Sequence, residues 1–165
     1  TVNGGGSDLL FPHHEFSAAH AAALSGHPLA DSYLHAGMVA YQGEKMSKSL
    51  GNLVLVSQLT AQGVDPRATR LALLAEHYRS DWEWTDATLA TAQDRLDRWT
   101  AWAASTTPSD DSTLLSALRE TLANDLNTPA ALTLIDEAIA AGAPASVTNL
   151  DTIAALLGVT LNPGR

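Results

Sequence analysis

The chain of 165 residues has no cysteine, few cations and no long apolar run. The absence of cysteine excludes a disulfide framework. Without a bilayer-spanning run or a secretory signal, the sequence predicts a soluble, cytoplasmic protein with no membrane partner. Nine Lys and Arg oppose 18 Asp and Glu, giving a formal charge of −9. This balance argues against a broad nucleic-acid surface, because neutralising phosphates needs clustered cations.

Residues 43–52 (GEKMSKSLGN) contain the chemistry around which the rest of the chain is interpreted. Lys45 and Lys48 alternate with two hydroxyls, and a glycine near each end allows the backbone to bend. Lysine places a compact charge on a flexible stem, so such a loop can close over a polyphosphate. A solvated polar loop between a strand and a helix is the alternative interpretation.

Three motifs in order carry a resemblance to a known family. Residues 45–49 (KMSKS) reproduce the second signature of class I aminoacyl-tRNA synthetases. Residues 4–15 (GGGSDLLFPHHE) and 35–38 (HAGM) are similar to the cysteine-specific branch of that family. The resemblance implies a mainly α fold, in which the C-terminal remnant of a class I, Rossmann-like α/β catalytic domain is followed by a helical bundle.

The resemblance also implies where an adenylate would bind. Gly6, Ser7 and Asp8 would contact the aminoacyl-adenylate, and the backbone at Val39 would touch the adenine. From composition alone, the glycine-rich start would be a flexible lead-in. His35 would lie near the site, although a structural histidine explains it equally well. Asp8 is the candidate for orienting the attacking amine, because a carboxylate accepts hydrogen bonds from amines.

The two lysines are the predicted catalytic residues. By resemblance, the carboxylate of L-cysteine attacks the α-phosphate of ATP bound with Mg²⁺. Lys48, with Lys45 beside it, would stabilise the charge that builds on the leaving pyrophosphate.

A zinc ligand is implied at His13, the first histidine of its motif. Paired histidines near a helix start are more often surface or capping residues. The family's acidic ligand corresponds to Ser17 here, and a neutral hydroxyl is a poor zinc ligand. The zinc cysteines and the first ATP-binding signature are expected upstream. We therefore expect a C-terminal fragment that is inactive alone.

Turn and cap residues predict the secondary structure. Pro12 suits the first turn of a helix that runs to Gly26, and residues 33–41 read as one strand that ends at Gln42-Gly43. Further helices should start at four polar residues, Ser57, Asp65, Thr85 and Asn127, and a last one should run from Ser146 to Gly158. A buried stripe is expected at Leu89, Ala92, Leu96, Trp99 and Ala103.

Composition shifts divide the chain into three predicted regions. Residues 1–56 would be the C-terminal part of the catalytic domain with its lysine loop. Residues 57–105 would be a connecting helical region. The polar linker 106–111 would introduce a C-terminal bundle over 106–165.

Two enzymes of the family fit the resemblance. One is cysteinyl-tRNA synthetase; the other is the ligase that joins cysteine to the amine of glucosaminyl-inositol in mycothiol biosynthesis. Ser17, Phe16, the acidic charge and the end of the chain without an anticodon-binding module favour the ligase. The predicted partners are therefore ATP, L-cysteine and glucosaminyl-inositol, and tRNA is not expected to bind. The full-length protein is predicted to be a monomer. A non-catalytic helical interaction module is the third alternative.

Overall fold

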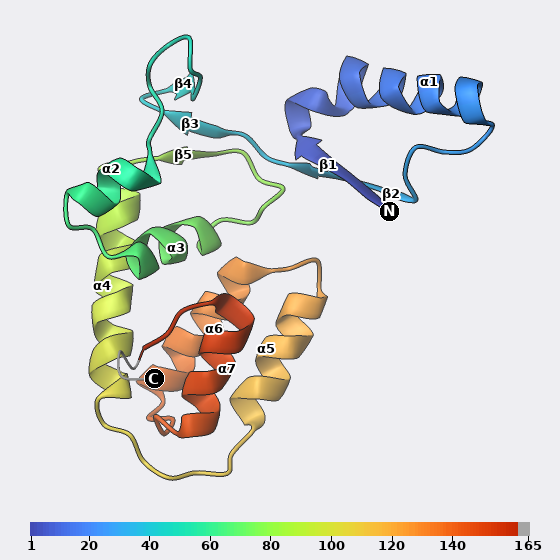
Figure 1. Ribbon diagram of the computed structural model, residues 1–165. Coiled ribbons are helices and arrows are strands. Elements are labelled where there is room, and N and C mark those ends of the chain that lie inside the picture. The colour runs from blue at the N-terminus through green and yellow to red at the C-terminus, as the bar shows by residue number, and fades with distance from the viewer. Residues whose placement is uncertain (162–165) are drawn as a thin grey trace. The chain divides into compact units, whose positions relative to one another are not determined.

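A computed structural model describes residues 1–161, which form two compact units (Figure 1). The first unit contains Thr1–Leu53 and the returning segment Tyr78–Trp84. The second contains Val54–His77 and the chain from Thr85 onward. Within residues 1–161 no helix is both long and apolar enough to cross a membrane.

The first unit begins with a β-α-β arrangement. Strand β1 (Val2–Gly6) pairs in parallel with β2 (Ser32–Ala36), and α1 (Glu15–Ser25) connects them. This is the usual crossover between parallel strands. Gly26 ends α1 in the left-handed conformation, at φ 71°, as a C-terminal glycine commonly does.

Helix α1 begins three residues later than the sequence predicts. After a short 3₁₀ turn, η1 (Ser7–Leu9), a wide turn, η2 (Leu10–His14), comes first. Phe11 is extended within it, at φ −139° and ψ 135°. A residue before proline is sterically kept out of the helical region, so Pro12 cannot be preceded by a helical Phe11 without strain.

The second sheet of this unit has three short strands in the order β4-β3-β5. Strand β3 (Val39–Tyr41) is antiparallel to β4 (Glu44–Lys45) and parallel to β5 (Trp82–Trp84). Gln42 and Gly43 join β3 to β4 with φ values of 56° and 76°. Two consecutive left-handed residues form the tight turn whose twist matches a hairpin.

The single strand predicted over residues 33–41 is wrong, because its two halves belong to different sheets. The break lies at Gly37 and Met38, whose N–H groups donate to Tyr78 O (2.8 Å) and Asp81 Oδ1 (2.7 Å). A Cβ at Gly37 would lie 2.0 Å from Ser80 O. The returning segment therefore replaces the strand-to-strand hydrogen bonds at this point.

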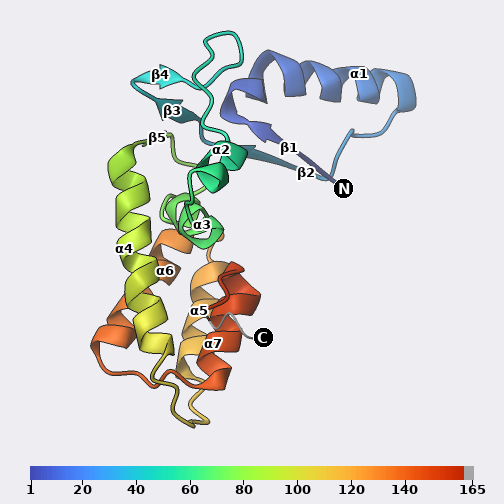
Figure 2. The same ribbon diagram turned by 60° about the vertical axis from the view of Figure 1, so that its left-hand side comes forward.

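The second unit is entirely helical in the part of the chain described. Its helices are α2 (Val56–Ala61), α3 (Pro66–Leu74), α4 (Asp86–Ala103), α5 (Thr113–Ala123), α6 (Thr128–Ala140) and α7 (Val147–Leu157). Figures 1 and 2 show α5, α6 and α7 side by side. The separation of residues 57–105 from 106–165 as distinct domains stays a prediction.

Four of the predicted caps are confirmed. The side chains of Asp65, Thr85, Asn127 and Ser146 each accept a backbone N–H of the helix that follows. Ser57 is not a cap, because α2 already begins at Val56 and Leu55 occupies the cap position. The cap and the start of the helix therefore lie two residues earlier than predicted.

The core of the second unit contains the predicted stripe of α4. Ala92, Leu96, Trp99 and Ala103 are buried, whereas Leu89 is half-buried. They pack in a core with fully buried leucines and isoleucines from the other helices, Leu71, Leu118, Leu132, Ile135 and Ile153. The stripe is therefore packing surface, as expected from its spacing.

Candidate active site

Two glycines at the carboxyl end of β1 allow side chains to approach the strand closely. A Cβ at Gly6 would lie 2.6 Å from Asp8 Oδ1 and 3.2 Å from Met38 Sδ. A Cβ at Gly5 would lie 3.0 Å from His14 Cε1. A larger residue at either position would force these side chains to shift, so the glycines permit the close approach.

Asp8 and Lys45, both predicted site residues, form an ion pair. Lys45 Nζ lies 2.6 Å from Asp8 Oδ2, and both side chains are about half-exposed. The hydrogen bond from Lys45 lowers the pKa of Asp8, and the nearby His13 lowers it slightly further. The structure thus connects the turn after β1 to the first lysine of the 43–52 loop.

The lysine loop is closed by Asn52, a residue with no role predicted from the sequence. Asn52 Oδ1 accepts from the N–H of Ser47 at 2.8 Å, and Asn52 Nδ2 donates to Lys45 O at 3.2 Å. Ser47 Oγ accepts from the N–H of Leu50 at 3.3 Å. Side-chain bonds of Asn to nearby backbone are a common way to hold a tight loop. This local pattern is the signal that could have identified Asn52.

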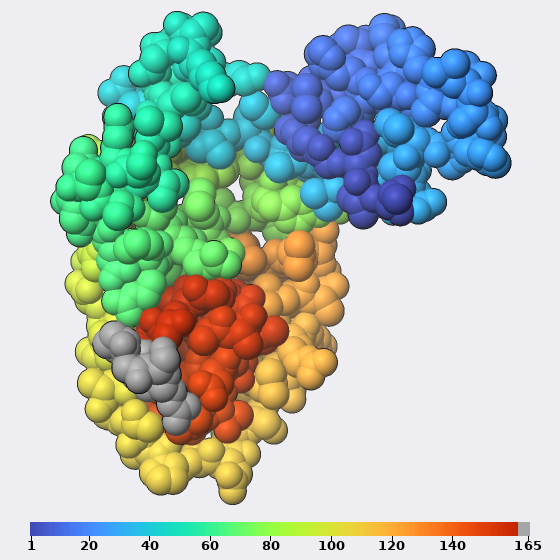
Figure 3. Space-filling view, in the orientation of Figure 1, coloured from blue at the N-terminus to red at the C-terminus, as the bar shows by residue number. Residues whose placement is uncertain are grey.

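Lys48 and Val39 occupy different environments beside this loop. The Lys48 side chain is exposed and has no hydrogen bond or ion pair to any other residue in the described range 1–161. Val39 is half-buried on β3, and its carbonyl accepts from the N–H of Met46 at 3.4 Å. The loop lies at the molecular surface (Figure 3). Lys48 is therefore available to an anion, whereas Lys45 is already paired.

A pair of imidazoles lies on the β-α-β arrangement. His14 Nδ1 and His35 Nε2 are 2.8 Å apart, so one ring nitrogen donates and the other accepts. Both histidines line a cavity of about 270 Å³, together with Leu10, Glu15, Ala18 and Tyr33. From the sequence, His35 is explained equally well as a residue near the site or as a structural histidine, and His14 has no predicted role. The only feature of the sequence that could have indicated a role for His14 is its position next to His13.

The residues present do not by themselves build a zinc site. His13 and Ser17 are both exposed and offer one imidazole and one hydroxyl, whereas a structural or catalytic zinc takes three or four strong ligands. Within residues 1–161 no group of three or more His, Asp or Glu side chains could hold a metal ion. His13 as a zinc ligand stays a prediction.

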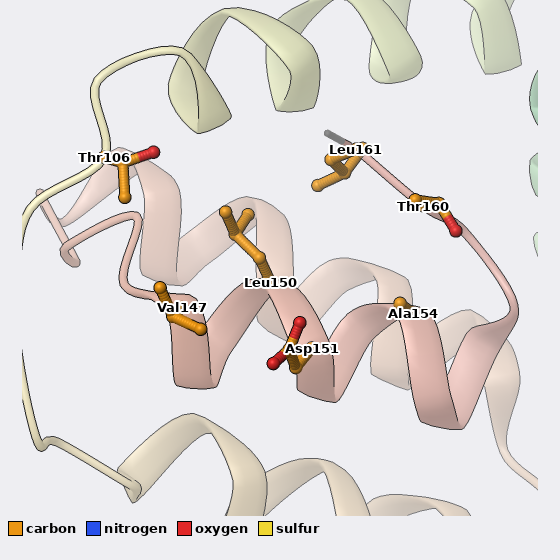
Figure 4. A pocket seen from close by; sticks show the side chains of 7 residues that line it. All are labelled: Thr106, Val147, Leu150, Asp151, Ala154, Thr160 and Leu161. Carbon is orange, nitrogen blue, oxygen red and sulfur yellow. The ribbon is translucent and has the colours of Figure 1, made fainter. Parts of the chain in front are cut away.

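The second unit has a separate small pocket, of about 140 Å³ (Figure 4). It is lined by Thr106, Val147, Leu150, Asp151, Ala154, Thr160 and Leu161. One carboxylate and no cation stand among these lining residues, so the pocket lacks the donors that a polyphosphate requires. The candidate site is therefore the one in the first unit.

The first unit has the features of a nucleotide-binding α/β domain: a parallel β-α-β arrangement, glycines at the carboxyl end of a strand, and a surface loop with an available lysine. Residues 1–94 match the family model described as the class I (C) tRNA synthetase catalytic domain, and the chain belongs to this family. This match confirms the family membership and the fold class that the sequence motifs predict.

Several relatives are similar over nearly the whole chain. An L-cysteine:1D-myo-inositol 2-amino-2-deoxy-alpha-D-glucopyranoside ligase from Clavibacter michiganensis subsp. michiganensis is 61% identical over 98% of this chain and 39% of its own length. The ligase of the same name from Streptomyces griseus subsp. griseus is 54% identical over 97% and 41%. The chain spans about two fifths of the length of these curated relatives.

A solved structure shows a related fold. The leucyl enzyme in the ternary complex of Agrobacterium radiobacter K84 agnB2 LeuRS with tRNA and LeuAMS aligns with a TM-score of 0.58. The alignment covers 97% of this chain and 26% of that chain, at 20% identity. At this identity the likeness concerns the fold alone.

Proposed function

We propose that this chain is part of an ATP-dependent ligase that activates L-cysteine as cysteinyl-adenylate and transfers it to the amine of glucosaminyl-inositol, a step of mycothiol biosynthesis. The observation that carries the proposal is the 61% identity to a protein named as that ligase, over nearly the whole chain. ATP, L-cysteine and glucosaminyl-inositol are the proposed substrates.

In the first step, the cysteine carboxylate attacks the α-phosphate of ATP, and pyrophosphate with its Mg²⁺ leaves. Lys48 supplies positive charge to the leaving phosphates, since its ammonium is exposed and unengaged within residues 1–161. Lys45 adds a second charge once it is released from Asp8. Gly6, Ser7 and Asp8 would border the adenylate, and the Val39 backbone would contact the adenine.

In the second step, the amine of the amino sugar attacks the acyl carbonyl, an amide bond forms, AMP leaves with the electron pair of the broken bond, and the nitrogen releases one proton to water. Asp8 can accept a hydrogen bond from that amine and so orient its lone pair. The position of Asp8 supports this role, because its side chain lies beside Gly6 at the carboxyl end of β1 and is 43% exposed.

His13 is proposed as one zinc ligand, with the remaining ligands outside this chain. Zinc when bound would recognise the substrate sulfur as thiolate and so exclude serine. His13 is exposed and free to join such a set. No step of the mechanism above depends on it.

A second candidate is cysteinyl-tRNA synthetase, which shares the activation step. The neutral Ser17 and the adjacent Phe16, whose exposed ring contacts Phe11 edge-on at 5.8 Å between centroids, favour the ligase, since they distinguish this chain from that enzyme's motif. The acidic balance of the chain agrees.

The deciding experiment uses a polypeptide of the relatives' full length that contains this chain. Cysteine-dependent exchange of pyrophosphate into ATP tests activation, and the zinc-loaded protein is then offered glucosaminyl-inositol or tRNA as acceptor. Cysteine transfer to the amino sugar but not to tRNA supports the ligase. Transfer to tRNA instead establishes the synthetase, and a folded protein without exchange supports a non-catalytic module.

A further inference from the structure

The ion pair between Asp8 and Lys45 joins the two predicted parts of the site, the adenylate residues and the lysine loop. We infer that Asp8 is an exchange point for ammonium groups: in the activation step the ammonium of L-cysteine displaces Lys45 from Asp8, and the released Lys45 then binds the nucleotide. Binding of the amino acid and of ATP would thus reinforce each other. The inference rests on the proposed function and adds to it a coupling between the substrates.

The Asp8 carboxylate is already engaged by Lys45. Asp8 Oδ1 lies in the space beside Gly6, 2.6 Å from where a Cβ of that residue would be, and the Asp8 side chain is 43% exposed. Oδ2 is held by Lys45 Nζ at 2.6 Å. An incoming ammonium that binds Oδ2 must therefore displace Lys45.

Only the Lys45 side chain needs to move for the exchange. Its backbone is fixed, because the peptide carbonyl accepts from Asn52 Nδ2 and Ala40 pairs with Lys45 across the hairpin. The side chain is 55% exposed and stands on a flexible four-carbon stem. It can leave Asp8 without disturbing the loop that carries Lys48.

The expected coupling is modest. Exposed ion pairs contribute little, so releasing Lys45 changes the nucleotide affinity by about two- to fivefold. By linkage, the nucleotide must tighten amino-acid binding by the same factor.

The test measures the affinity of the full-length protein for α,β-methylene ATP, which blocks adenylation, alone or with saturating amino-acid ligand. L-cysteine is compared with 3-mercaptopropionate, which lacks only the amine. L-cysteine should tighten the analogue about two- to fivefold, and 3-mercaptopropionate should leave it unchanged. Equal effects of the two ligands would overturn the exchange.

Variants locate the effect. Asp8→Asn should bind the analogue without cysteine as tightly as the wild type does with it, and Lys45→Met should lose the coupling. Lys45→Arg keeps the charge and should keep the coupling, whereas Lys48→Ala should weaken the analogue with and without cysteine alike. Coupling that persists in Lys45→Met contradicts the exchange alone. A protein that binds neither analogue nor cysteine contradicts the proposed function as well.

Discussion

Replacing Gly37 with alanine should disrupt the first unit severely. The new Cβ would lie 2.0 Å from Ser80 O and 2.8 Å from Asp81 N, which are backbone atoms that cannot rotate away. Overpacking of this kind costs about 1–3 kcal/mol. The hydrogen bonds of Gly37 to Tyr78 and of Met38 to Asp81 would also be lost, at about 1 kcal/mol each. We therefore expect the free energy of unfolding to fall by roughly 3–5 kcal/mol.

Urea denaturation followed by tryptophan fluorescence measures this loss. Trp82 and Trp84 lie on β5 of the first unit, and the backbone N–H of Trp82 donates to Met38 O beside the break. Gly26→Ala is the matched control: Gly26 has φ 71° and no atom within 4 Å of an added Cβ, so only the left-handed backbone is strained. That strain costs about 1–2 kcal/mol. If Gly37→Ala were no more destabilising than Gly26→Ala, the close contact with the returning segment would not exist.

Three further predictions concern the lysine loop and the helical unit. Lys48→Ala should reduce cysteine-dependent pyrophosphate exchange by about 10²-fold with little change in cysteine affinity, as kinetics with varied cysteine would show. Asp136→Ala should cost about 2–4 kcal/mol in urea denaturation, because Asp136 accepts from the fully buried Trp99 Nε1 at 2.7 Å and from Arg95 Nε at 2.9 Å. Asp65→Ala should lose a helix cap worth about 0.5–2 kcal/mol. Hydrogen bonds from Arg67 lower the pKa of Asp65 in the folded protein. The stabilisation by the ionised carboxylate should therefore be complete above pH 3.8, the ordinary pKa, and be lost as the pH falls through the lower pKa of the folded state. Urea denaturation at a series of pH values measures this loss.

The helices of the second unit were predictable because their signals are local. Asp65, Thr85 and Ser146 each bind an N–H two or three residues ahead, so the sequence alone contains both partners. The buried face of α4 follows from a spacing of three and four residues within one helix. None of these features depends on a distant segment.

The sheets were predicted less well because distant segments decide them. Residues 33–41 have the composition of one strand, but Gly37 is in contact with Ser80, more than 40 positions away. Strand β5 was not predicted for the same reason: its partner is β3, and the tryptophans resemble the lead-in to a helix. Periodicity within a short window contains no information about such a partner.

The candidate site combines both situations. The sequence identified Lys45, Lys48 and Asp8 as candidate site residues. Nothing in their spacing predicted that a carboxylate 37 positions earlier would hold Lys45 while Lys48 stays exposed. The β3-β4 hairpin that carries Lys45 is also bound to the returning segment, since the Gly43 N–H donates to Glu83 Oε1 at 2.6 Å. Two lysines of one short motif thus differ in availability because of residues outside the motif. A motif can therefore identify the chemistry of a loop, while the surrounding fold decides which of its lysines is free to act first.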